Sequence, residues 1–149
     1  MGLAIAEQLQ KQALAMVEKR AILKPSQHYL SLPQAAVELY FDIEAEPERN
    51  LDYLLGVIVV DRRQGTEHFH GFLAQTPDQE AEIWSAFIEL VGQYPHAPIY
   101  HFSEYERETI KRLAKLYDTP KGVREQILIQ CVDLHHHVVS QVICPVESY

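Results

Sequence analysis

Polar and apolar residues alternate strictly from residue 37 to residue 44, in the order Val-Glu-Leu-Tyr-Phe-Asp-Ile-Glu. A period of two residues is that of a β-strand, whose side chains point alternately to its two faces. The odd-numbered positions form an apolar face, and Asp42 and Glu44 lie together on the opposite face. The pattern therefore predicts a strand that carries two neighbouring carboxylates near its end.

Two more strands are expected directly after this one. The run from Leu54 to Val60 is almost entirely apolar, and residues 66–74 follow it beyond the turn sequence Arg62-Arg63-Gln64-Gly65. Two strands joined by such a short polar connection form a hairpin. The first three strands are therefore predicted to form an antiparallel meander.

A helical period precedes this meander. Apolar residues recur at helical spacing over residues 3–22, which predicts an amphipathic helix. Pro25 and Pro33 bracket a connector that neither a helix nor a central strand would tolerate. We expect an N-terminal helix and connector over residues 1–33 and one folded domain over residues 34–149.

Two further helices are predicted after the meander. The sequence Thr76-Pro77-Asp78-Gln79 has a capping threonine and a proline at the first helical position, and an apolar stripe follows it up to Val91. A short strand at residues 99–102 separates this helix from another over residues 104–117. Beyond them, the apolar run 127–132 predicts a final strand, and Asp133 is then expected to cap a following helix.

The resulting order is β-β-β-α-β-α. Three antiparallel strands followed by alternating helices and strands predict an α/β fold with a mixed sheet and flanking helices. With 149 residues, of which 47% are hydrophobic and 23% charged, the chain has the composition of one ordinary globular domain.

The formal net charge of -8 excludes binding of nucleic acid through bulk electrostatic attraction. Any such binding requires a local basic strip or bound metal ions. The chain contains no apolar run long enough to span a membrane and no signal sequence, and its two cysteines have no zinc or disulfide spacing. We expect a cytoplasmic protein.

The Asp42 and Glu44 pair is the first candidate site. Adjacent carboxylates repel each other unless a cation lies between them, and their hard oxygen atoms suit Mg²⁺ or Mn²⁺. Carboxylate clusters that hold two such ions cleave phosphodiesters. The alternative is a solvent-facing strand, which the same residues would also suit.

Glu106 is the second candidate. It shares a helix face with Ile110, Leu113 and Tyr117, so it should point toward the sheet from the first helical turn, where an anion is favoured. The alternative is a capping box over residues 103–106. On the outer side of this helix, a basic strip could meet a phosphate backbone or simply face solvent; it consists of Arg107, Lys111 and Lys115.

Two other kinds of site are not favoured. The adjacent histidines His135, His136 and His137 splay about 100° apart on a helix and cannot all reach one zinc ion. Cys131 lies between apolar residues that should raise the pKa of its thiol, which argues against a nucleophile.

Several segments, in this order, resemble the RecB-like nuclease family with a YprB-type RNase H-like domain, which belongs to the DEDD 3'-5' exonuclease superfamily. The resemblance covers nearly the whole chain and is carried by Gln12-Ala13, Phe41-Asp42-Ile43-Glu44-Ala45-Glu46-Pro47, Asp52-Tyr53-Leu54-Leu55-Gly56, Ile99-Tyr100-His101-Phe102-Ser103-Glu104-Tyr105-Glu106, Cys131-Val132-Asp133-Leu134 and Glu147-Ser148-Tyr149.

The resemblance implies a nuclease that uses Mg²⁺ or Mn²⁺. By it, Asp42 and Glu44 hold the metal ions and Glu106 takes the place of the acidic ligand in the second motif. His101, Tyr105 and Asp133 take supporting places, and the partners are nucleic acid, DNA or RNA, and other domains of a longer parent protein.

The sequence departs from the family pattern in two respects. A glutamate and a phenylalanine replace the aspartate and asparagine of the second motif, and the third motif is absent before Tyr149. We therefore expect a C-terminally truncated fragment that lacks one ligand of a full two-metal site and that need not be active in isolation. The alternative function is a non-catalytic RNase H-like module that docks nucleic acid or protein.

Overall fold

The computed structural model describes residues 2–24 and 31–145. The chain divides into two compact units. The larger unit comprises Pro33–Leu134, and the smaller unit is formed by residues 1–32 and 135–149.

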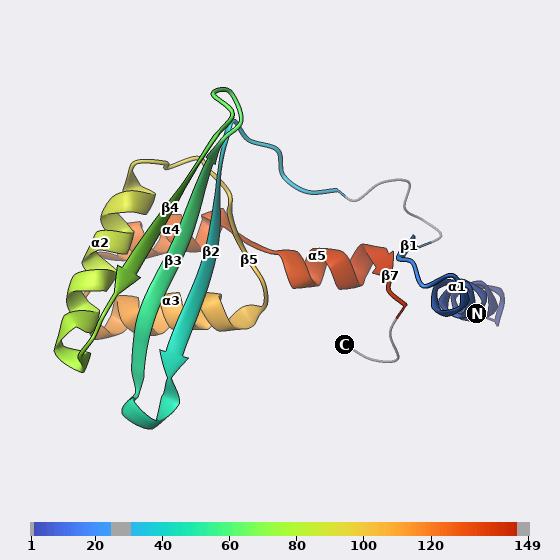
Figure 1. Ribbon diagram of the computed structural model, residues 1–149, viewed down its shortest axis with the longest axis horizontal. Coiled ribbons are helices and arrows are strands. Elements are labelled where there is room, and N and C mark those ends of the chain that lie inside the picture. The colour runs from blue at the N-terminus through green and yellow to red at the C-terminus, as the bar shows by residue number, and fades with distance from the viewer. Residues whose placement is uncertain (1, 25–30, 146–149) are drawn as a thin grey trace. The chain divides into compact units, whose positions relative to one another are not determined.

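The larger unit is built on a five-stranded sheet with the strand order β4-β3-β2-β5-β6. β2, β3 and β4 are antiparallel neighbours, whereas β5 runs parallel to β2 and β6 runs parallel to β5. The mixed sheet predicted from the sequence is confirmed (Figure 1). The strands are β2 (Val37–Glu46), β3 (Leu51–Asp61), β4 (Thr66–Leu73), β5 (Ile99–His101) and β6 (Cys131–Asp133).

Three helices cover one face of this sheet (Figure 1): α2 (Glu80–Gly92), α3 (Glu104–Leu116) and α4 (Lys121–Gln130). The apolar positions of β2 meet the apolar stripe of α2, where the rings of Phe41 and Phe87 stack with their centroids 4.6 Å apart. Leu39, Phe87 and Ile110 are completely buried in this core. Burial of the apolar face leaves the Asp42 and Glu44 face of β2 outside the helical layer.

The apolar run 127–132 does not form the predicted strand. Residues up to Gln130 belong to α4, and only Cys131–Asp133 pair in the sheet. A short apolar run fits a strand and a buried helix equally well. Tertiary contacts favour the helix. Ile127 packs into the core, and the side-chain amide of Gln130 donates to the carbonyl groups of Tyr94 and Ala97 at 2.7 and 2.8 Å.

The start of α2 also differs from the prediction. A short 3₁₀ helix, η2 (Pro77–Gln79), precedes it, and Thr76 makes no side-chain capping hydrogen bond. The Gln79 side chain instead accepts a 2.8 Å hydrogen bond from the Gln75 amide. A second 3₁₀ helix, η1 (Pro47–Arg49), joins β2 to β3.

The smaller unit contains α1 (Gly2–Glu18), α5 (Leu134–Gln141) and a two-stranded antiparallel sheet of β1 (Ile22–Leu23) and β7 (Val142–Ile143). The first helix ends earlier than residue 22 because Lys19 adopts a positive φ of 50°. The Gln12 side chain donates to the Cys144 carbonyl at 3.1 Å. Among the described residues, no helix is long and apolar enough to cross a membrane.

Candidate functional site

The Asp42 and Glu44 carboxylates lie on the sheet face that is opposite α2 and α3, and both side chains are exposed. The strand alternation predicts this placement. Directly after Glu44 the pairing of β2 with β3 shifts register, so the two acids precede a local irregularity of the strand. Both residues line one groove on this face.

Glu106 follows β5, the parallel neighbour of β2, and belongs to α3. Tyr40 of β2 pairs with Tyr100 of β5, so Asp42 lies level with the point at which the chain leaves β5 and turns into α3. Glu106 is in the first turn of α3 and is 5% exposed. The turn after β5 therefore delivers a buried carboxylate to the edge at which Asp42 lies.

The pKa of the Glu106 carboxyl is raised above its ordinary value. Burial is the largest cause, and the negative charge of Asp42 adds to it, while nearby His101 and a hydrogen bond from Ser103 oppose it. The His101 Nδ1 atom lies 3.6 Å from the Glu106 carboxylate, and the Ser103 hydroxyl donates to that carboxylate at 3.5 Å. The Asp42 charge thus acts on Glu106, but it contributes less to the raised pKa than burial does.

The capping box predicted at residues 103–106 is formed only in part. The Ser103 hydroxyl accepts a 3.3 Å hydrogen bond from the Tyr105 amide, as a helix cap does. The Ser103 amide, however, donates to the Asp133 carboxylate at 3.3 Å and not to Glu106. The reciprocal bond from the Ser103 amide to the Glu106 carboxylate is therefore missing, although that carboxylate accepts from the backbone amide of Glu106 itself.

Ser103 holds a backbone conformation that normally requires glycine, with φ 114° and ψ 177°. Such a conformation costs on the order of 1–3 kcal/mol and occurs most often at functional sites. Contacts on both sides hold it, since Asp133 accepts from its amide and the His101 Nδ1 atom lies 2.7 Å from its carbonyl oxygen. His101 and Asp133 thereby fix the turn that presents Glu106.

The donors at this site fit a hard divalent cation that is also held by water and substrate. Among residues 2–24 and 31–145, no three His, Cys, Asp or Glu side chains gather into a group that could hold a metal ion. Mg²⁺, however, usually keeps several waters and binds through one or two carboxylates together with substrate phosphates. Asp42 and Glu106 have the chemistry of such a partial ligand set.

The structure does not bring four of the predicted residues to this site. The Tyr105 hydroxyl donates to Asp52 at 3.2 Å, on the helix-covered side. Arg107 donates to the Leu128 carbonyl of α4 at 2.8 Å, and Lys111 pairs with Glu108 on its own helix. Lys115 is exposed further along α3. The basic strip lies on the helical layer and not beside the exposed carboxylates.

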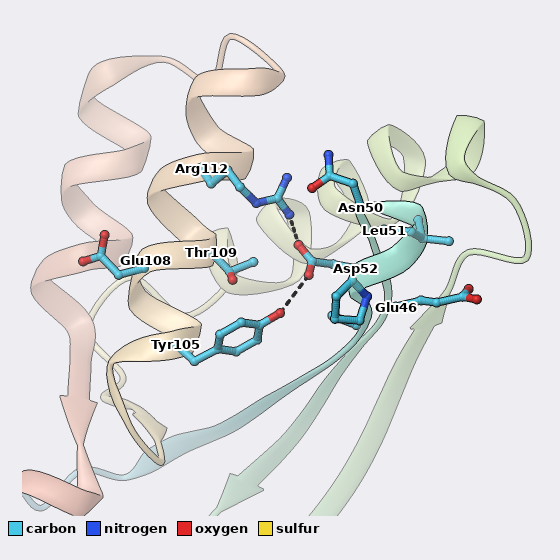
Figure 2. A pocket seen from close by; sticks show the side chains of 10 residues that line it. Glu46, Asn50, Leu51, Asp52, Tyr105, Glu108, Thr109 and Arg112 are labelled. Atoms are coloured by element: carbon cyan, nitrogen blue, oxygen red, sulfur yellow. Dashed lines mark hydrogen bonds and ion pairs between the residues drawn. The ribbon is translucent and has the colours of Figure 1, made fainter.

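A second polar cluster was missed from the sequence. Asp52 at the start of β3 is 3% exposed. Its carboxylate forms an ion pair with Arg112 of α3 and accepts a hydrogen bond from the Tyr105 hydroxyl (Figure 2). The Asp52 amide donates to the Glu80 carboxylate of α2 at 2.8 Å, and Tyr117 donates to the same carboxylate at 2.5 Å. These contacts tie both helices to β3 beside a groove of about 370 Å³.

Burial raises two pKa values in this cluster. It raises the pKa of Asp52, which the Arg112 charge opposes, and it raises the pKa of the Tyr117 hydroxyl to about 12. The sequence signal that could have revealed this cluster is the helical spacing of Tyr105, Thr109 and Arg112, which places them on one face of α3. Because every polar group named here has a partner, the cluster is a structural clamp.

The structure shows where the histidine triplet and Cys131 lie. The triplet His135-His136-His137 belongs to α5 and is not part of any group that could hold a metal. Burial raises the pKa of the Cys131 thiol to about 11, so this thiol is protonated at neutral pH.

Comparison with known proteins gives one match. The model of the family RNase_H_2, of the RNase_H superfamily, matches residues 39–149. No curated protein and no solved structure matches the chain. The matched segment begins in β2 and includes the other four strands of the five-stranded sheet.

Proposed function

The chain belongs to the RNase H superfamily, and on that premise we propose that it hydrolyses phosphodiester bonds in nucleic acid with divalent metal ions, as a DEDD-type 3'-5' exonuclease of the RecB-like family does. The observation that carries the proposal is that Asp42, on the central strand, lies level with the end of β5, from which the chain turns into α3 and its buried Glu106.

In this proposal Asp42, Glu44 and Glu106 hold Mg²⁺ or Mn²⁺. Such an ion, when bound, lowers the pKa of an attacking water and neutralises charge on the phosphate. Asp42 and Glu44 provide exposed oxygen ligands, and Glu106 provides a ligand from the protein side. His101 and Asp133 keep the strained Ser103 turn in place, so that Glu106 is positioned before any ion arrives.

The charge of the chain supports a dependence on metal ions. A protein with a net charge of -8 and two exposed carboxylates in its groove repels a phosphate backbone. The basic strip of α3 lies on the other side of the sheet and cannot offset that repulsion at the groove. Divalent cations at Asp42 are therefore needed for binding as well as for catalysis.

The proposal is tested by titrating the protein with Mn²⁺ in a calorimeter. We expect a millimolar or tighter site in the wild type that Asp42→Asn weakens at least about tenfold, because one anionic ligand is lost. Glu82→Gln, which removes an exposed acid from α2, is the matched control and should bind as the wild type does.

The same titration separates the proposal from its main alternative, a non-catalytic docking module. A docking module needs no metal at Asp42. Heat of Mn²⁺ binding that is equal in the wild type and in Asp42→Asn would favour the docking module and contradict the nuclease proposal.

A further inference from the structure

A row of bare backbone lies beside Asp42 on the exposed sheet face. Asp42 of β2 pairs with Gly56 of β3, and Gly56 pairs with Gly71 of β4, so the three residues follow one another across the strands. Neither glycine has a positive φ, since Gly65 is the glycine with that conformation among the described residues. Backbone conformation therefore does not account for the glycines, whereas the space that they leave for a neighbouring side chain does.

The ring of Phe69 lies over this row. A Cβ atom placed on Gly71 would lie 3.0 Å from the Phe69 Cε1 atom, and one placed on Gly56 would lie 3.5 Å from its Cε2 atom. One side of the ring therefore rests on the two glycines. Phe69 is nevertheless 68% exposed, so most of its aromatic surface is offered to solvent.

The exposed ring and the carboxylates line the same groove. Phe69, Asp42 and Glu44 all border a cavity of about 580 Å³, together with Ile58 and Phe102. Neighbouring strands are about 4.8 Å apart, which places Gly71 about 10 Å from Asp42 across the sheet. Because the Phe69 ring rests on both Gly56 and Gly71, it lies between about 5 and 10 Å from Asp42 across the sheet, which is the size of one nucleotide.

We infer that Phe69 is a stacking residue for an unpaired base of a single-stranded nucleic acid whose phosphate lies at Asp42. This inference rests on the proposed function and adds the class of substrate. An aromatic ring stacks on any base, but a base within a duplex is already stacked on its neighbours, so the groove selects single strands.

A protein partner fits the groove less well. An apolar helix or a second copy of the chain seated on Phe69 would also bury Asp42 and Glu44, and burying unpaired carboxylates is costly. When a nucleotide binds together with divalent cations, the cations neutralise these carboxylates and the base covers the exposed ring of Phe69.

The test measures the binding of a fluorescently labelled oligothymidylate to the full chain by anisotropy, in saturating Ca²⁺. Phe69→Ala should weaken binding about ten- to a hundredfold, because stacking contributes on that scale for each base, whereas Phe69→Trp should retain it. Ile129→Ala, at a 78% exposed apolar residue of α4, is the control and should change nothing. A blunt duplex of the same sequence should bind at least about tenfold more weakly than the single strand.

The inference fails if Phe69→Ala binds the oligonucleotide as tightly as the wild type, or if the duplex binds as well as the single strand. It also fails if Phe69→Ala changes only the oligomeric state, which would identify a second copy as the occupant. The Mn²⁺ titration of Phe69→Ala keeps the two proposals apart. If Phe69→Ala keeps the metal affinity and the oligonucleotide affinity of the wild type, the stacking role alone is refuted. If the wild type binds no Mn²⁺ in a manner that depends on Asp42, the nuclease proposal is refuted.

Discussion

Replacing Asp42 with asparagine should lower metal-dependent cleavage of a single-stranded oligonucleotide by at least about a hundredfold. Mutating a residue that only supports a metal ligand already lowers metal affinity or activity by about 10- to 100-fold. Mutating a direct ligand should lower activity at least as much. The substitution keeps the size of the side chain and removes its charge. The measurement is the initial rate of product formation in Mn²⁺ by wild type and variant at equal concentration.

The same variant should keep its fold, because Asp42 is exposed and the core of β2 lies on the other face. Its unfolding midpoint in urea should match that of the wild type. Glu82→Gln is the matched control for a general effect of charge and should cleave at the wild-type rate. Cleavage by Asp42→Asn at the wild-type rate would exclude Asp42 as a metal ligand.

Replacing Arg112 with alanine should reduce the free energy of unfolding by about 2–4 kcal/mol. Arg112 is the cation that faces two buried carboxylates, Asp52 through an ion pair and Glu80 at 3.8 Å. Breaking a buried ion pair from one side costs about 3–5 kcal/mol, and the value is lower here because the Arg112 side chain is 40% exposed. Urea unfolding monitored by the fluorescence of Trp84, which is buried in the same layer, measures the loss.

The neighbouring residue Lys111 provides the control, since it pairs with Glu108 on the surface of the same helix. Lys111→Ala should cost less than about 0.5 kcal/mol. A loss after Arg112→Ala that is no larger than this would show that the Asp52 cluster does not clamp the helices to the sheet.

The pH dependence of the Arg112→Ala effect has a definite sign. Burial raises the folded-state pKa of Asp52, and loss of Arg112 removes the charge that opposes this rise. An acid with a raised folded-state pKa destabilises the fold above that pKa and ceases to do so below its unfolded value. The difference in stability between variant and wild type should therefore be largest at neutral pH and shrink toward about pH 4. An equal difference at both pH values would contradict this explanation.

The central strand and its two acids could be predicted from the sequence because the signal is local. The two-residue period of residues 37–44 fixes which side chains share a face, and the packing of Phe41 against Phe87 then leaves Asp42 and Glu44 exposed. The inward direction of Glu106 follows in the same way from the period of its helix.

Other features depend on contacts that no local pattern reveals. Asp52 meets Glu80 and Arg112, which are 28 and 60 residues away, so its burial could not be predicted from its neighbours. The run 127–132 is too short for its period to distinguish a strand from a helix, and the contacts of Gln130 decide in favour of α4. The basic strip was predicted on the correct helix, but the contact of Arg107 with α4 depends on tertiary packing.

The strained backbone of Ser103 also depends on a long-range contact. A serine in this position reads as an ordinary helix cap, and its hydroxyl does cap α3. Its strained backbone arises only because β6 brings Asp133 to its amide, at a distance of 30 residues along the chain. Long-range strand order, rather than local propensity, therefore brings Asp133 to the turn that precedes Glu106.

The most direct test of a metal site at Asp42 is a crystal of the protein soaked in Mn²⁺ and measured at a wavelength where manganese scatters anomalously. The predicted result is a peak about 2 Å from a carboxylate oxygen of Asp42 and from one of Glu44 or Glu106. A peak only at the Asp52 cluster or at the histidines of α5, or no peak at Asp42 at saturating Mn²⁺, would contradict it.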